Sequence, residues 1–201
     1  MTRIDTGRPD RVLPTPSHTV GPFYGYALPF PGGPDIAPVG RPGTITLQGH
    51  VLDGAGAPIP DALLELWGPD PEGNLPRVDG SIRRDPATGG YLGRNGVEFT
   101  GWGRVQTDAN GHWYARTLRP GARGRSAPYL SVCVFARGLL VHLFTRVYLP
   151  SDETVLAADP LLARLPRERR DTLIARPQAD GTFRFDVRLQ GEGETVFLEF
   201  T

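Results

Sequence analysis

Apolar and polar residues alternate along much of this chain with the period of two that is typical of half-buried β-strands. The clearest alternation lies in TITLQGHVL at 44–52 and in HWYARTL at 112–118. The same pattern predicts further strands at Asp61–Trp67, Trp102–Thr107, Tyr129–Ala136 and Leu140–Leu149. Six candidate strands by residue 149 favour an all-β fold, a β-sandwich of mixed or antiparallel sheets with long loops, of which 68–101 is the longest.

The alternation stops between residues 151 and 176. Pro160 and Pro166 bracket the apolar segment LLARL, and Arg167–Ala175 has a helical pattern with a proline at its start. We therefore expect one or two short helices near 160–175. Alternation returns in FRFDVRL at 183–189 and TVFLEF at 195–200, which the turn GEGE would join as a hairpin.

Residues 1–43 contain many of the prolines, so this segment is expected neither to form a helix nor to join a central strand. Four aromatic residues are spaced through it: Phe23, Tyr24, Tyr26 and Phe30. Aromatic rings in a segment without its own core indicate an arm that docks onto the body or onto a partner chain. The sequence thus predicts an N-terminal arm over 1–43 and a sandwich domain over 44–201.

Composition narrows the classes of partner. The 201 residues include 22 Lys and Arg against 22 Asp and Glu, which leaves no net field to attract nucleic acid or an anionic membrane. No segment has the length of a membrane span, and the first ten residues lack the apolar region of a signal peptide. A single cysteine, Cys133, excludes internal disulfides and suits a reducing compartment, so a cytoplasmic protein is expected.

The residue patterns reveal no catalytic or metal-binding cluster. The four histidines are isolated in sequence: His18, His50, His112 and His142. Cys133 lies in an apolar run without a nearby base, and no G-x-S-x-G elbow occurs. The carboxylates that could be imagined as general acids are better explained as structural hydrogen-bonding groups: Glu65, Asp108 and Asp186.

Two arginines need an anion because they lie in or beside apolar strands. For Arg146, inside LVHLFTRVYL, a structural ion pair is favoured. Arg137 follows SVCVFA and precedes Gly138, so contact with a carboxylated ligand is about as probable as an ion pair.

The chain resembles the intradiol ring-cleavage dioxygenases. The motifs that carry the resemblance are TPSHTVGPF (15–23), GHVLDGAGAPIPDALLELW (49–67), TDANGHWYARTLRPG (107–121), APYLSVCVFARG (127–138), HLFTRVYLPSDE (142–153) and FRFDVRLQGEGETVFLEF (183–200). The last two blocks resemble the α subunits of the two-subunit members. The resemblance implies a β-sandwich that pairs with a homologous β subunit, in which two tyrosinates and two histidines hold Fe(III).

The chain departs from that ligand set throughout. Tyr129 and Ser131 occupy the family's two histidine positions, Ala122 and Arg123 follow the Pro-Gly pair where a ligand tyrosine is expected, and Leu75 falls near the other tyrosine's place. The resemblance therefore implies no metal and no catalytic residue in this chain, with iron only in the partner.

In the family the α subunit completes the substrate pocket of its partner. Carried over by motif, this role falls on residues near a small aromatic substrate: Thr19, Gly21, Pro22, Phe23 and Arg137. Phe23 stands where related chains have a tyrosine, so Tyr24 is a candidate substitute. The implied reaction is cleavage of 3,4-dihydroxybenzoate by O₂ to 3-carboxy-cis,cis-muconate in the catabolism of aromatic compounds.

Two other interpretations compete with this one. The first is a non-enzymatic, prealbumin-like β-sandwich binding module, because a hairpin like DGAGAPIPDALLELW recurs in such domains. Such modules are shorter, need neither the arm nor the helical insertion, and tend to be secreted. The second is a self-sufficient dioxygenase, which would need metal ligands that the sequence does not offer.

Overall fold

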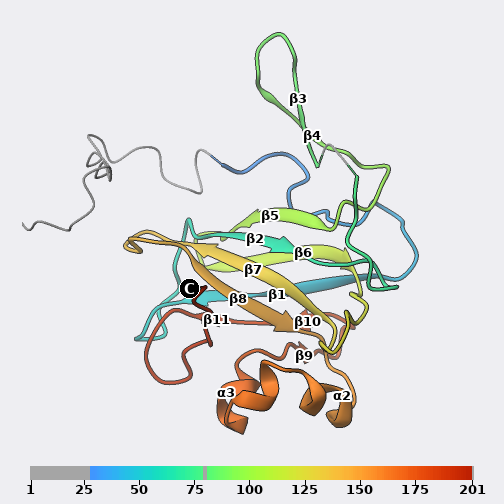
Figure 1. Ribbon diagram of the computed structural model, residues 1–201. Coiled ribbons are helices and arrows are strands. Elements are labelled where there is room, and N and C mark those ends of the chain that lie inside the picture. The colour runs from blue at the N-terminus through green and yellow to red at the C-terminus, as the bar shows by residue number, and fades with distance from the viewer. Residues whose placement is uncertain (1–27, 79–80, 201) are drawn as a thin grey trace, which may run out of the picture.

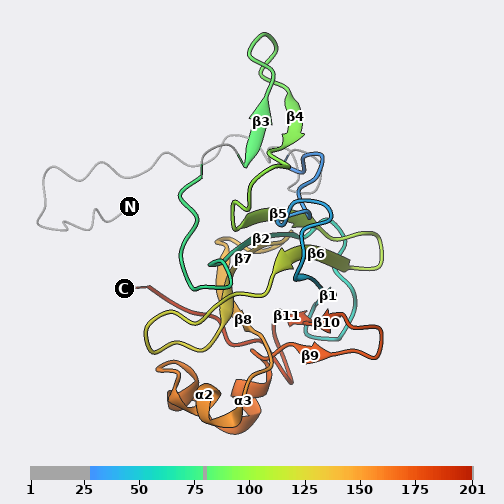
Figure 2. The ribbon, with the colours of Figure 1, turned by 90° about the vertical axis from the view of Figure 1, so that its right-hand side faces the viewer.

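The computed structural model describes residues 28–78 and 81–200, and its strands form two sheets that lie face to face (Figures 1 and 2). The first sheet has the order β11 (Val187–Arg188), β1 (Thr44–Leu52), β10 (Phe183–Arg184), β9 (Arg176–Pro177), with β6 (His112–Leu118) also paired to β1. Residues 44–50 of β1 pair antiparallel with the whole of β6, whereas β10 and β11 run parallel to β1. The sheet is therefore mixed.

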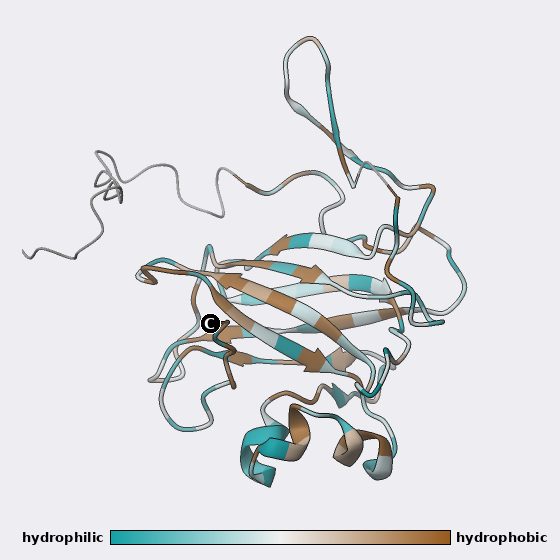
Figure 3. Ribbon diagram, viewed as in Figure 1, coloured by the Kyte–Doolittle hydropathy of each residue, from teal (hydrophilic) through white to brown (hydrophobic). Residues whose placement is uncertain are grey.

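The second sheet has the order β5 (Trp102–Gln106), β2 (Leu63–Trp67), β7 (Tyr129–Phe135), β8 (Leu143–Tyr148), and all its neighbours are antiparallel. Its inward side chains pack against those of the first sheet in one apolar core that includes Leu47, Val51, Leu66, Trp113 and Val132. Figure 3 shows the apolar stretches on the central strands. Each such side chain stabilises the sandwich by about 1.5–3 kcal/mol. The predicted all-β sandwich is confirmed.

A two-stranded hairpin projects from the end of the sandwich opposite the helices (Figures 1 and 2). It consists of β3 (Ile82–Arg84) and β4 (Tyr91–Arg94). The sequence predicts a long loop over 68–101, which includes this hairpin. Strands of three and four residues with little apolar alternation are too short for periodicity to detect.

The helical segment follows β8. It contains α2 (Glu153–Ala158), the 3₁₀ helix η1 (Leu162–Arg164) and α3 (Arg167–Asp171). Leu156 and Leu162 pack in a second core with Tyr148, Leu173 and Val196. α2 precedes the expected region, and the helical stretch predicted to reach residue 175 ends at 171. The reason is that the backbone on either side of Ile174 bonds instead to Tyr148 of β8. No helix among the described residues is long and apolar enough to cross a membrane.

The C-terminal hairpin expected between 183–189 and 195–200 closes only at its turn, where the Thr195 amide donates to the Arg188 carbonyl at 3.0 Å, and the strand pairing expected beyond the turn is wrong. Residues 183–184 and 187–188 pair with β1, and 195–200 instead runs towards β8, where the Leu198 amide donates to the Phe144 carbonyl at 2.8 Å. Gly49 allows residues 183–188 to lie close beside β1, because a Cβ at this position would lie 1.8 Å from the carbonyl oxygen of Phe185.

The described part of the arm, residues 28–43, packs on the sandwich. Phe30 stacks on Trp102 with ring centroids 5.8 Å apart, and Ile36 is 1% exposed in the main core. Asp35 forms an ion pair with Arg116 of β6. This half of the arm therefore adds buried surface to the domain. Residues 1–27 lie outside the described residues.

Candidate functional site

The two positions at which the family resemblance implies histidine ligands lie on the outer face of the second sheet. Tyr129 and Ser131 alternate along β7 with the buried residues Leu130 and Val132, so both side chains point away from the core. In the strand register, Ser131 stands between Trp67 of β2 and Arg146 of β8. Strand pairing thus brings the predicted positions and Arg146 into one patch.

Arg146 covers this patch with its guanidinium. The guanidinium carbon lies 4.2 Å from the ring centroid of Tyr129, and Nη1 donates to the Tyr148 hydroxyl at 3.1 Å. Burial lowers the pKa of Arg146, but the hydrogen bond to Tyr148 and nearby negative groups raise it more, so the side chain stays charged. The ion pair expected for Arg146 is wrong, because a ring and a phenol contact its guanidinium in place of a carboxylate.

The Tyr148 hydroxyl connects Arg146 to a buried carboxylate through a second hydrogen bond. Burial raises the pKa of its phenol, which therefore keeps its proton and donates to Asp159 Oδ1 at 3.0 Å. Asp159 is fully buried and also accepts from the backbone amides of Ala127, Leu161 and Leu162 at 2.8–3.1 Å. Arg146, Tyr148 and Asp159 thus link β8 to the start of β7 and to the helical segment.

These residues do not fit a ferric ion. Fe(III) favours anionic oxygen and imidazole donors, whereas the phenol of Tyr148 is held protonated, the Tyr129 ring lies under a cation, and Ser131 offers an exposed hydroxyl. In the described part of the chain, no group of three or more His, Cys, Asp or Glu side chains is arranged to hold a metal. The patch of Tyr129, Ser131 and Arg146 therefore offers no ligand set for a ferric ion.

Arg137 lies at the other end of β7, eight residues from Tyr129, which is roughly 25 Å along a strand. Its guanidinium forms an ion pair with Asp61, and its side chain remains 62% exposed. Asp61 has a φ of 58°, in the left-handed region. Arg137 therefore lies apart from the patch of Tyr129, Ser131 and Arg146. The other predicted substrate contacts, Thr19, Gly21, Pro22 and Phe23, lie outside the described residues.

Three carboxylates and the cysteine have the structural roles that the sequence predicts. Glu65 accepts from Arg104 Nε at 2.8 Å across β2 and β5, and Asp108 accepts from the amides of Asn110 and His112, so both are structural groups as predicted. Asp186 likewise accepts from the His50 amide at 2.9 Å. Burial, together with the charge of Glu65, raises the pKa of the Cys133 thiol to about 11, as an inert cysteine requires.

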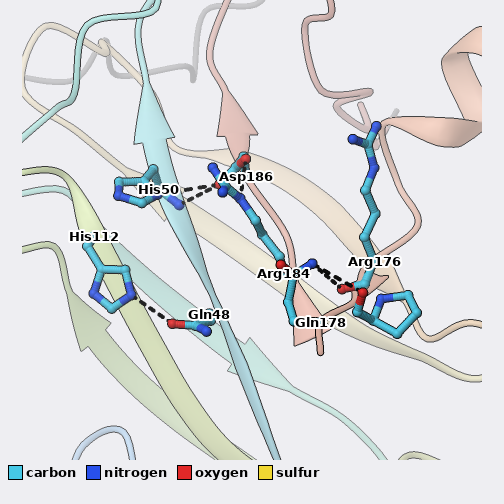
Figure 4. Close-up of polar contacts among 8 residues, drawn as sticks. Gln48, His50, His112, Arg176, Gln178, Arg184 and Asp186 are labelled. Carbon is cyan, nitrogen blue, oxygen red and sulfur yellow. Dashed lines mark hydrogen bonds and ion pairs between the residues drawn. The ribbon is translucent and has the colours of Figure 1, made fainter. Parts of the chain in front are cut away.

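One side-chain cluster, a pair of histidines on β1 and β6, was not predicted from the sequence. His50 and His112 are directly opposite on β1 and β6, with ring centroids 5.3 Å apart (Figure 4). His112 Nε2 lies 3.1 Å from Gln48 Oε1, and His50 Nδ1 lies 3.6 Å from Asp186 Oδ1. Pairing the two strongest predicted strands in antiparallel register would have found this contact. The two rings supply too few ligands for a metal site.

A cavity of about 610 Å³ opens beside this cluster. Charged side chains of both signs line it: Glu168, Asp171, Arg176, Arg184, Asp186 and Arg188. Arg184 donates to Asp186 at 2.9 Å, and the three cations balance the three anions. The lining therefore favours neither an anionic nor a cationic ligand.

Comparison with known proteins identifies the family to which this chain is related. A family model described as "Dioxygenase" matches residues 33–129. The protocatechuate 3,4-dioxygenase alpha chain of Burkholderia cepacia is 39% identical, over 92% of this chain and 96% of the relative. The alpha chain of Pseudomonas putida is 36% identical, over 96% of this chain and all of the relative. The beta chain from Burkholderia cepacia is 30% identical, over 75% of this chain and 66% of that relative.

A solved structure shares the fold. The dioxygenase domain of a dioxygenase and carbohydrate-binding protein fusion from Streptomyces sp. SirexAA-E superimposes with a TM-score of 0.57 at 22% identity, over 89% of this chain and 99% of that chain. This likeness shows that the two domains share the all-β sandwich fold.

The chain belongs to the intradiol ring-cleavage dioxygenase family, and the relatives that it matches over almost their whole length are alpha chains. Members of this family are oxidoreductases, so the enzymatic interpretation is favoured over a non-enzymatic binding module.

Proposed function

We propose that this chain is the alpha subunit of a protocatechuate 3,4-dioxygenase. With a homologous beta subunit it opens the ring of 3,4-dihydroxybenzoate with O₂ to give 3-carboxy-cis,cis-muconate. The observation that carries the proposal is the match to two alpha chains at 36–39% identity over more than nine-tenths of this chain. The cytoplasm is the proposed compartment, which suits a chain with one cysteine.

Iron belongs to the beta subunit in this proposal, because the residues at this chain's ligand positions do not fit a ferric ion. There the iron supplies the redox chemistry with O₂. This chain binds its partner and completes the wall of the substrate pocket with residues of the arm: Thr19, Gly21, Pro22 and Phe23. Pro22 restricts the backbone, and the adjacent ring gives an apolar face to an aromatic substrate. Tyr24 is the candidate to supply the phenol that Phe23 lacks.

Arg137 orients the carboxylate of the substrate. Its guanidinium has five N–H donors in a fixed plane, so it can contact Asp61 and a second carboxylate together. A hydrogen-bonded contact with a charged group is worth about 1.5–3 kcal/mol, or roughly 10- to 150-fold in kcat/KM.

The test of Arg137 compares two substrates in the assembled enzyme. Arg137→Ala should lower kcat/KM for 3,4-dihydroxybenzoate at least about tenfold and change it little for catechol, which lacks the carboxylate. Asp61→Asn is the matched control, because it breaks the same ion pair and leaves the arginine in place. Equal losses for the two substrates, or no loss, would remove Arg137 from the substrate site.

The proposed function itself is tested by producing the chain alone and together with its homologous beta chain. Only the co-purified pair should consume O₂ when 3,4-dihydroxybenzoate is added. Deletion of residues 1–27 should weaken the association of the two chains, because the arm is proposed to dock on the partner. A pair that forms but does not turn over this substrate would refute the proposal.

A further inference from the structure

We propose that Arg146 keeps the patch that it forms with Tyr129 and Ser131 closed to metal ions, so that introducing the two histidine ligands would not by itself create a metal site. This inference deepens the proposed function in one respect, the absence of iron from this chain. It depends on the geometry of β7 and β8 and on the family's ligand positions. The identity of the substrate does not enter it.

The first step is the position of the guanidinium. Side chains two residues apart on one strand share a face, so imidazoles at positions 129 and 131 would converge above the outer face of β7. Arg146 is the direct cross-strand neighbour of Ser131 and lies 4.2 Å from the Tyr129 ring. A metal ion held by the two imidazoles would therefore lie within roughly 5 Å of a permanent positive charge.

The second step is the rigidity of that charge. Nη1 of Arg146 donates to the Tyr148 hydroxyl, which is fully buried and donates in turn to Asp159. Asp159 is a buried carboxylate whose other bonds come from neutral amides, and Arg146 is the cation that contributes to its electrostatic environment. Moving the guanidinium away would break its hydrogen bond to Tyr148 and weaken its attraction to the buried Asp159 carboxylate, which is unfavourable.

The third step is the nature of the exchange. Phenol oxygens and imidazoles are the donors that the family resemblance implies for a metal ion at these positions. Here a guanidinium takes the place of that cation, and it contacts one phenol ring and one phenol hydroxyl. The patch therefore keeps a positive charge in a fixed position, supplied by a side chain of β8.

The experiment measures Ni²⁺ binding to the full-length chain by titration calorimetry, without substrate or partner. The background variant is Tyr129→His with Ser131→His. In it, Ni²⁺ binding should equal that of the wild type, which sets the baseline. Adding Arg146→Gln, whose amide can still donate to Tyr148, should create one new site at least about tenfold tighter than that baseline. Adding Arg146→Lys in its place should not, because it keeps the charge.

Three results would overturn the proposal. They are a new tight site in the background variant with Arg146 retained, no new site in the folded Arg146→Gln variant, or equal binding in the Gln and Lys variants. If Arg146→Gln unfolds the chain, Arg146→Met, which keeps an unbranched side chain over the Tyr129 ring without the charge, replaces it and the titration is repeated. Failure here leaves O₂ consumption by the assembled pair unaffected, so it is distinguishable from failure of the proposed function.

Discussion

Replacing Asp159 with alanine should be among the most destabilising single changes in this chain. The carboxylate is fully buried and accepts four hydrogen bonds, three from backbone amides and one from Tyr148. Its removal leaves the amides of Ala127 and Leu162, both buried residues, without acceptors, and each unsatisfied group costs about 1–3 kcal/mol. Relief from burying a charge offsets part of this. We expect the free energy of unfolding to fall by about 3–5 kcal/mol and Tm to fall by roughly 10 °C.

The assay is urea unfolding followed by circular dichroism and by the fluorescence of the buried Trp113. Asp171→Ala is the matched control, because Asp171 is an exposed residue of α3, and it should change the free energy by less than about 0.5 kcal/mol. A loss below about 1 kcal/mol for Asp159→Ala would refute the reasoning, since the network would then contribute no more than one ordinary hydrogen bond.

Three further predictions concern the sandwich. Gly49→Ala would bring a Cβ within 1.8 Å of the Phe185 carbonyl and should cost about 3 kcal/mol in urea unfolding, whereas Gly96→Ala, with open space around it, should cost little. Because the pKa of Cys133 is raised from 9.0 to about 11, iodoacetamide at about pH 8 should label the folded chain roughly a hundredfold more slowly than an unfolded control, and rapid labelling would contradict this. Hydrogen bonds from the amides of His112 and Asn110 lower the pKa of Asp108, so its stabilisation is present above the ordinary value of 3.8 and is lost as pH falls through the lower folded value. The difference in urea midpoint between wild type and Asp108→Asn should therefore shrink below about pH 4, and a constant difference would argue against this role.

The sequence predicts the sandwich well where strands are long and one face is buried. β1 and β6 alternate over nine and seven residues, and both were located at their full length. β3 and β4 were missed because each is only three or four residues long and mostly polar. The strand pairing expected beyond the C-terminal turn was wrong because local alternation cannot show that residues 183–188 pair with β1, a contact that depends on Gly49 more than 130 residues away.

At the candidate site, too, residue identities follow from the local sequence, whereas contacts between strands depend on how the strands pair. The motif alone predicts that Tyr129 and Ser131 depart from the ligand set that the resemblance implies. It does not predict the role of Arg146, because its contacts with Tyr129 and Tyr148 depend on the register of β7 against β8 and on the burial of Asp159 by the helical segment. The opposition of His50 and His112 was missed for the same reason, since the two residues are 62 positions apart.

The most direct test of the account is the iron content of the chain measured with and without its homologous beta subunit. Plasma emission spectroscopy and the visible absorption of tyrosinate bound to Fe(III) should show no stoichiometric iron in the chain alone. In the co-purified pair they should show one iron for every two chains, together with O₂ consumption that depends on 3,4-dihydroxybenzoate. Stoichiometric, coloured iron in the isolated chain would contradict the claim that it completes a partner's site and holds no metal of its own.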